Sequence, residues 1–342
     1  MTLLVTGATG FVMSVLARRW LESNPAARLV VLDSAPLDDA ARRYFAPVEE
    51  RLDVIVADVS RPETWISEIS AFEITRIVHG ATITPLSRGT AAEERREPEA
   101  DSPARIVDVN VMGTVAVLEF ARTLPRLQRF VYVSSGAVYK NHGPDRPGEP
   151  LPEDGYVMPR RLYGISKLAS ELIVERYGDL FRMSTASVRP SSVYGTMDRV
   201  TASRNFRHVP NRIAHLALAG HGEVCVNSLE AVGDYVHVED VADAIISLLE
   251  APSLRYSSYN VANGSTASIA DIVGWVAEKV PGFKARVVPA AQADLVQDPS
   301  LRDGMWGAYD ISRIAVETGW KPRPMRVALH AYLEWLLVEQ RS

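Results

Sequence analysis

The first 33 residues constrain the fold more than any other part of the chain. A short apolar run at residues 3–5 ends in a turn that carries Gly7 and Gly10, and residues 14–21 then have apolar side chains at helical spacing. A second apolar run, residues 29–32, ends in Asp33. This order predicts a strand, a tight turn, a helix and a second strand, which together open a doubly wound parallel sheet.

The glycine turn also predicts a dinucleotide site. Gly7 and Gly10 let the backbone approach a pyrophosphate without an intervening Cβ, and the helix that follows directs its positive end there. Asp33 stands about twenty residues further on, where an acid binds a ribose 2′-hydroxyl and repels a 2′-phosphate, so the pattern favours NAD. Met13 departs from the pattern, because a third small residue is expected there. Its thioether is expected to push the helix outward or to lie beside the pyrophosphate, and Met13→Gly is expected to bind NAD at least as tightly.

Composition limits the class of protein. The chain has 342 residues, of which 47% are hydrophobic, and a formal net charge of −5 with no long basic run, so nucleic acid is not an expected partner. The only cysteine, Cys225, fits a reducing compartment. No stretch approaches the roughly 18 apolar residues that a bilayer-spanning helix needs. We therefore expect a soluble, cytoplasmic protein that acts on a small molecule.

Apolar runs and helical patterns alternate along the first two thirds of the chain. Further buried strands are predicted at residues 52–56, 77–81, 129–133 and 184–188, with helices at 104–124 and 162–177 between them. We therefore predict an α/β fold, a Rossmann-type doubly wound parallel sheet with a smaller C-terminal α/β substrate lobe. The predicted dinucleotide-binding domain is 1–195, to which 234–262 return, and the substrate lobe is 196–233 with 263–342.

Catalytic chemistry is predicted by a tyrosine and a lysine four residues apart. Tyr163 and Lys167 share one face of a helix, so that the ammonium favours the phenolate form of the tyrosine. Ser134 and Ser135 end the fifth strand at the edge where ligands bind. A serine hydroxyl there can hold a substrate oxygen while Tyr163 exchanges its proton beside a hydride acceptor.

Taken together, these motifs resemble those of an extended short-chain dehydrogenase/reductase of the NAD-dependent epimerase/dehydratase family. The resemblance runs from the glycine turn to Thr318-Gly319-Trp320-Lys321-Pro322 and includes Arg189-Pro190 and the run Asp234-Tyr235-Val236-His237. It implies that Ser135 is the catalytic serine, that Tyr163 is the acid–base and that Lys167 anchors the ribose. It also implies a homodimer that pairs helices 104–124 and 162–177 across a two-fold axis. The positions expected to bind NAD are Gly7, Thr9, Gly10, Phe11, Val12, Asp33, Asp58, Val59, Gly80, Ala81, Thr82, Asn110, Tyr163, Lys167, Pro190 and Val193, and those expected to bind substrate are Thr84, Ser135, Gly136, Arg199, Arg204 and Arg302.

Two departures from the family pattern bear on the substrate. Gly136 follows Ser135, where sugar 4,6-dehydratases carry an acid, and Gly233 stands where enzymes of uridine-diphosphate sugars carry a diphosphate-binding arginine. Arg302 is a candidate second phosphate ligand. We expect Arg199 or Arg204 to bind a substrate carboxylate or phosphate, unless this basic segment is only a solvated loop.

The sequence leaves several alternatives open. Residues 87–103 form either a solvated loop or a lid, while His79 and His237 fit a core role and no metal site is predicted. The expected function is oxidation of a secondary hydroxyl of a sugar or sugar acid by hydride transfer to NAD, followed by release of NADH or by return of the hydride. A nucleotide-sugar 4-epimerase is one alternative, and a non-catalytic dinucleotide-binding sensor or scaffold is another.

Overall fold

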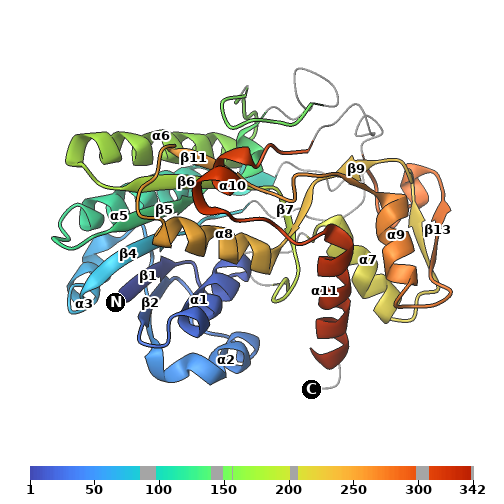
Figure 1. Ribbon diagram of the computed structural model, residues 1–342, viewed down its shortest axis with the longest axis horizontal. Coiled ribbons are helices and arrows are strands. Elements are labelled where there is room, and N and C mark those ends of the chain that lie inside the picture. The colour runs from blue at the N-terminus through green and yellow to red at the C-terminus, as the bar shows by residue number, and fades with distance from the viewer. Residues whose placement is uncertain (85–97, 140–148, 156, 201–206, 298–307, 340–342) are drawn as a thin grey trace.

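The protein is built on a seven-stranded parallel sheet (Figure 1). The structure, a computed structural model, describes residues 1–84, 98–139, 149–155, 157–200, 207–297 and 308–339. The strand order is β11-β6-β5-β4-β1-β2-β3, and every neighbouring pair is parallel. The strands are β1 (Thr2–Thr6), β2 (Arg28–Asp33), β3 (Leu52–Val56), β4 (Ile74–His79), β5 (Arg129–Val133), β6 (Thr185–Pro190) and β11 (Ser258–Val261).

The strand order reverses between β1 and β4. From β1 the chain builds outward to β3, then crosses back to β4 on the other side of β1. In a doubly wound sheet the carboxyl ends of the strands beside such a reversal form the ligand-binding crevice. The turn at Gly7 follows β1 directly, and Gly80 follows β4. The fold thus places the glycine turn at the crevice.

Helices cover both faces of the sheet, which explains why strands such as β5 are buried along their whole length. The apolar residues of one helical layer pack with α1, and those of the other pack with α5. The first layer contains α1 (Phe11–Ser23), α2 (Asp39–Phe45), α8 (Val238–Glu250) and α10 (Ser312–Thr318); the second contains α3 (Ile66–Ile69), α4 (Pro103–Val107), α5 (Gly113–Ala121) and α6 (Leu162–Phe181).

A second group of elements, here called the second lobe, has its own hydrophobic core at the other end of the molecule (Figure 1). It consists of α7 (Val209–Leu218), β8 (Glu223–Val226), α9 (Ile269–Ala277), β13 (Lys284–Val287) and α11 (Met325–Glu339). Two short strand pairs lie between the lobes, β7 (Ser192–Tyr194) with β10 (Tyr235–His237) and β9 (Val232–Gly233) with β12 (Ala267–Ser268).

The predicted fold class is confirmed, with six of the seven sheet strands where the sequence predicts them. The seventh strand, β11, is only four residues long and was not predicted. The same is true of β13, an exposed edge strand. Neither segment has a sequence pattern strong enough to predict a strand. The boundaries of the two predicted domains stay a prediction. Within the described residues, no helix combines the length and the apolar character needed to cross a membrane.

Candidate active site

The turn after β1 has a backbone that only glycine adopts readily. Gly7 has a φ of +82°, and a Cβ built on it would lie 2.9 Å from the backbone N and Cα of Ala81. Gly10 is the N-cap of α1 and supplies no capping side chain. An uncapped helix start beside a glycine turn is a favourable place for an anionic group.

Asp33, the last residue of the neighbouring strand β2, is hydrogen-bonded to this turn. Its Oδ2 accepts the backbone N–H of Thr9 at 3.0 Å, and its Oδ1 accepts the N–H of Ala35 at 3.2 Å. The structure therefore brings the predicted ribose-binding acid into direct contact with the glycine turn.

Met13 is accommodated by Gly80, which directly follows the neighbouring strand β4. Its side chain is buried, and a Cβ at position 80 would overlap both its Sδ and its Cγ. The small residue that lets the helix approach the sheet thus stands just after a strand, while the large residue stands on the helix. This exchange is invisible in a one-dimensional pattern.

Polar groups next to Gly80 also suit a bound cofactor. The hydroxyl oxygen of Thr82 is buried and has no hydrogen-bond partner among the described residues, and the same is true of Ser134 Oγ at the end of β5. Together with the space that a Cβ at Gly7 would fill, these atoms fit a dinucleotide with hydroxyl and phosphate groups.

Asp58, one of the residues expected to bind NAD, belongs to a charged cluster after β3. It accepts the N–H and the hydroxyl of Ser60, each at 2.9 Å, and forms an ion pair with Arg105 of α4. Desolvation acts to raise the pKa of Asp58, but the bonds from Ser60 and Arg105 outweigh it and lower this pKa below its ordinary value. The next residue, Val59, is buried against Gly113.

Asn110 links the end of β4 to α6 by hydrogen bonds. It lies in the π-helical turn Asp108–Met112, where its Oδ1 accepts the N–H of Ile83 at 2.7 Å. Its Nδ2 donates to the carbonyl of Ile83 at 3.2 Å and to Ser166 Oγ at 3.0 Å. Ser166 was not among the predicted site residues, although it lies inside the Tyr163-Gly-Ile-Ser-Lys motif that signals the site.

Lys167 is deeply buried, and none of the carboxylates that the structure describes forms an ion pair with it. Its Nζ donates to the carbonyl of Val133 at 2.8 Å and lies 5.1 Å from the ring centre of Tyr132 and 5.8 Å from that of Tyr163. Burial lowers the pKa of Lys167 to about 7. Glu171, one turn further along α6, instead holds Arg189 at 2.7 Å.

Ser135 lies directly opposite the start of α6. Its backbone is extended after β5, and its Oγ accepts the N–H of Ala137 at 3.1 Å. A Cβ on Gly164, in the first turn of α6, would overlap the carbonyl of Ala137 and lie 2.9 Å from Pro159 Cβ. Because position 164 is glycine, the turn that bears Tyr163 packs against the turn that bears Ser135.

Gly136, the residue after Ser135, is covered by Tyr309. A Cβ at position 136 would overlap the hydroxyl oxygen of Tyr309 and lie 3.0 Å from its Cζ. Burial raises the pKa of Tyr309, so its phenol stays neutral. The position at which dehydratases of the family carry an acid is thus filled by a phenol from a distant part of the chain.

The predicted substrate residues do not all gather at Ser135. Arg199 contacts Asp38 and Thr9, on the side of the glycine turn. Arg204 and Arg302 lie outside the described residues, as do residues 87–97 of the suggested lid. Thr84 follows β4 in the chain, whereas Pro190 and Val193, which were predicted to bind the cofactor, lie at the end of β6 and in β7. Their roles stay predictions.

The two histidines have structural partners. His79 contacts Thr6 Oγ1 at 2.7 Å and Thr114 Oγ1 at 3.0 Å, and burial lowers its pKa to about 3. His237 is the N-cap of α8 and contacts Arg323 at 2.8 Å. Among the described residues, no cluster of His, Cys, Asp and Glu side chains is arranged to hold a metal ion.

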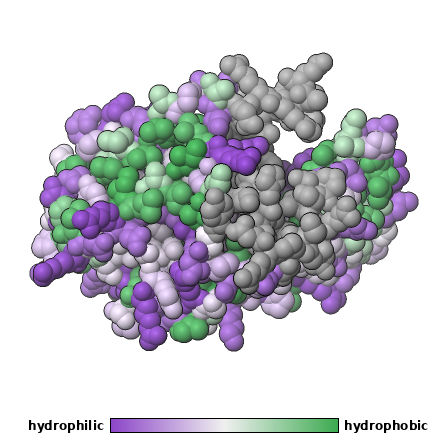
Figure 2. Space-filling view, turned by 90° about the horizontal axis from the view of Figure 1, so that it is seen from above, coloured by the Kyte–Doolittle hydropathy of each residue, from purple (hydrophilic) through white to green (hydrophobic). Residues whose placement is uncertain are grey.

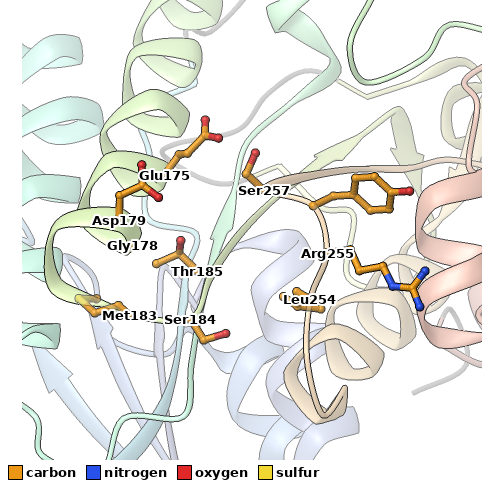
Figure 3. A pocket seen from close by; sticks show the side chains of 10 residues that line it. Glu175, Gly178, Asp179, Met183, Ser184, Thr185, Leu254, Arg255 and Ser257 are labelled. Atoms are coloured by element: carbon orange, nitrogen blue, oxygen red, sulfur yellow. The ribbon is translucent and has the colours of Figure 1, made fainter.

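A cavity of about 270 Å³ lies at the opposite edge of the sheet (Figure 3). Thr185 and Ser257 line it at the amino ends of β6 and β11, together with Glu175 and Asp179 near the end of α6. None of the predicted site residues in the described part of the chain lines it, so it is separate from the site described above.

A glycine turn at the switch point, an acid on the second strand and a buried lysine four residues after a tyrosine define a dinucleotide-dependent oxidoreductase. The chain matches the NAD-dependent epimerase/dehydratase family over residues 3–262 and belongs to that family. NAD is its cofactor, and the predicted family, enzyme class and cofactor are confirmed.

Several known proteins are similar over nearly the whole chain. UDP-glucose 4-epimerase of Mycolicibacterium smegmatis is 26% identical over 324 residues, 94% of each chain. Among solved structures, UDP-glucuronic acid 4-epimerase from Bacillus cereus, in complex with UDP-glucuronic acid and NAD, is 20% identical with a TM-score of 0.74 and covers 100% of both chains. A GalE-like L-threonine dehydrogenase from Cupriavidus necator is 22% identical with a TM-score of 0.76, covering 98% of this chain and 100% of its own. The two structural similarities show the fold.

Proposed function

We propose that this protein oxidises a secondary hydroxyl of a sugar or sugar acid and then either returns the hydride, as an epimerase, or releases NADH. NAD, when bound, supplies the hydride acceptor. The observation that carries the proposal is the buried Lys167, whose ammonium lies against the ring of Tyr163 beside the Ser135 turn. A desolvated cation at this place favours the phenolate that a proton acceptor needs.

Each polar side chain then has a separate task. Ser135 holds the substrate hydroxyl by a hydrogen bond, and Tyr163 Oη takes its proton as the carbon is oxidised. Lys167 stabilises the phenolate. The carbonyl of Val133 orients Lys167 by accepting a hydrogen bond from its Nζ. Asn110 positions α6 through its hydrogen bond to Ser166. An epimerisation is completed when Tyr163 gives the proton back to the oxygen and the hydride returns to the opposite face of the same carbon.

A nucleotide-sugar 4-epimerase is the second candidate, favoured by the similarity to UDP-glucose 4-epimerase over 94% of each chain. The environment of Gly233 weighs against a diphosphate held at that position. A Cβ there would lie 2.6 Å from Cζ and 2.7 Å from Oη of Tyr235, so the tyrosine ring occupies the space that an arginine stem would need.

We also propose a homodimer in the cytoplasm. Apolar side chains are exposed on the helices that the family pairs: Ile165 and Leu172 on α6, and Met112 in the neighbouring π-helical turn, are 45%, 59% and 52% exposed. Figure 2 shows hydrophobic residues gathered on the face that carries α6. A contiguous apolar patch of this kind supports an interface. The free thiol of Cys225 is consistent with a reducing compartment.

Turnover of candidate substrates tests the proposal. Sugars, sugar acids and their nucleotide derivatives are incubated with the enzyme and NAD, and both NADH absorbance and product stereochemistry are followed. Accumulating NADH identifies a dehydrogenase, whereas isomerised product without NADH identifies an epimerase.

Variants of the catalytic residues complete the test. Ser135→Ala and Tyr163→Phe are expected to lower kcat about 10²–10⁴-fold while NAD binding persists. Unchanged turnover in Tyr163→Phe would contradict the mechanism, and unchanged biological activity in a catalytically dead variant would favour the sensor alternative.

A further inference from the structure

Arg199 lies on the segment of chain that leads into the second lobe, and its side chain contacts the cofactor-binding end of the sheet. It lies between β7 and α7 in the chain. Its guanidinium forms a bidentate ion pair with Asp38, the N-cap of α2. Nη2 lies 2.8 Å from both carboxylate oxygens of Asp38, and Nε lies 3.1 Å from Oδ2. Such a planar pairing is specific to arginine and orients both partners.

The same guanidinium also reaches the glycine turn. Nη2 donates to the carbonyl oxygen of Thr9 at 3.3 Å, while the N–H of Thr9 is held by Asp33 at 3.0 Å. Thr9 is thus held through its carbonyl by Arg199 and through its N–H by the predicted ribose-binding acid. Arg199 therefore touches the turn itself and the loop that follows β2.

The segment that carries Arg199 is firmly anchored. Met197 is buried and has a left-handed backbone conformation, with a φ of 66°. Few residues other than glycine adopt this conformation, and it persists only where the surrounding structure holds it. The carbonyl of Asp198 accepts a bond from Asn211 Nδ2 at 3.2 Å, and Asn211 also donates to Tyr332 of α11 at 2.8 Å. The base of Arg199 is therefore fixed to the second lobe.

One nitrogen of Arg199 has no hydrogen-bond partner among the residues that the structure describes. Nη1 is buried, and none of the described residues accepts a hydrogen bond from it. An unpaired donor of a charged group is costly away from water, and a ligand with anionic or hydroxyl oxygens relieves that cost. The position beside Thr9 and Asp38 makes the dinucleotide the nearest ligand of that chemistry.

We propose that Arg199 and Asp38 form a clasp that retains the bound dinucleotide. The clasp joins the glycine turn, the β2–α2 loop and the anchored segment from the second lobe, so these parts must separate before the cofactor leaves. This role assigns Arg199 to cofactor retention, in place of the substrate role expected from the sequence. It depends on NAD binding alone, not on the identity of the substrate.

The clasp is tested by the rate at which the cofactor dissociates. NADH is bound to the cofactor-free enzyme, the complex is mixed with a large excess of NAD, and the decay of the NADH fluorescence is followed in a stopped-flow instrument. Arg199→Ala and Asp38→Asn are expected to raise the dissociation rate about tenfold or more. Asparagine at 38 preserves the cap of α2, because Asn and Asp are equally good N-caps.

A matched control variant distinguishes the loss of the clasp from a general destabilisation of the protein. Arg19 forms an equally short two-pronged ion pair with Asp243, joining α1 to α8. Arg19→Ala is expected to leave the dissociation rate within twofold of the parent. The double variant of Arg199 and Asp38 is expected to be no faster than either single variant, because both remove one interaction.

Three results would overturn the clasp: an unchanged rate in Arg199→Ala, an equal increase in Arg19→Ala, or multiplying effects in the double variant. Because no turnover is measured, failure of the proposed catalytic function leaves this test intact.

Discussion

Lys167, which we propose stabilises the Tyr163 phenolate, is expected to destabilise the folded protein. Its side chain is almost fully buried, its Nζ has one hydrogen bond to the carbonyl of Val133, and the nearby Glu171 is bound to Arg189. Lys167→Met keeps most of the length and volume of the side chain while removing the charge. We therefore expect the variant to be inactive and more stable than the parent enzyme.

The magnitude comes from the pKa. A change of one in pKa corresponds to about 1.4 kcal/mol, so a fall in the Lys167 pKa from 10.5 to about 7 corresponds to about 3–5 kcal/mol of native-state destabilisation at neutral pH. The lost bond to Val133 leaves a buried carbonyl unsatisfied, which costs about 1–3 kcal/mol. The expected net gain in the free energy of unfolding is about 1–3 kcal/mol.

The gain also depends on pH in a defined direction. Below pH 7 both the folded and the unfolded parent hold the proton on Lys167, so the full cost is present. As pH rises from about 7 toward 10.5, only the unfolded state keeps this proton, and the parent becomes more stable relative to the variant. The advantage of Lys167→Met should shrink by about 2 kcal/mol between pH 7 and pH 9.

Urea unfolding of cofactor-free protein at pH 6, 7, 8 and 9 measures both effects. Lys279→Met is the control, because Lys279 pairs with Glu334 on the surface and should change stability by less than about 1 kcal/mol. A Lys167→Met variant that is less stable than the parent at every pH, or whose advantage is independent of pH, would refute the reasoning.

Three further predictions test other contacts. Gly80→Ala should lower the free energy of unfolding by about 1–3 kcal/mol by overlapping Met13, and Met13→Ala should restore most of it in the double variant; additive losses in urea titrations would contradict this contact. Gly136→Ala should displace the Tyr309 phenol and lower kcat/KM, and Tyr309→Phe should recover part of the loss; full activity in Gly136→Ala would show that the overlap is unimportant. Leu172→Glu should convert the proposed dimer to a monomer in sedimentation velocity, whereas an unchanged mass would place the interface elsewhere.

Local chemistry made much of the fold predictable. The strand, glycine turn, helix and Asp33 follow one another within the first 33 residues, and their apolar spacing and backbone requirements are properties of consecutive residues. The same holds for Tyr163 and Lys167, whose spacing places them on one helix face. The short strands β11 and β13 were missed because four residues carry too little pattern to separate a strand from a loop.

The sequence by itself thus determined the class of fold, the cofactor and the chemical types at the centre of the site. Only the tertiary structure decided the environment of those groups: Gly164 opposite Ala137 sets the approach of α6, burial lowers the pKa of Lys167, and Arg199 meets Asp38 across 161 positions of sequence. Desolvation, close approach and long-range ion pairing depend on distances between residues that are remote in the chain. A one-dimensional pattern does not contain those distances.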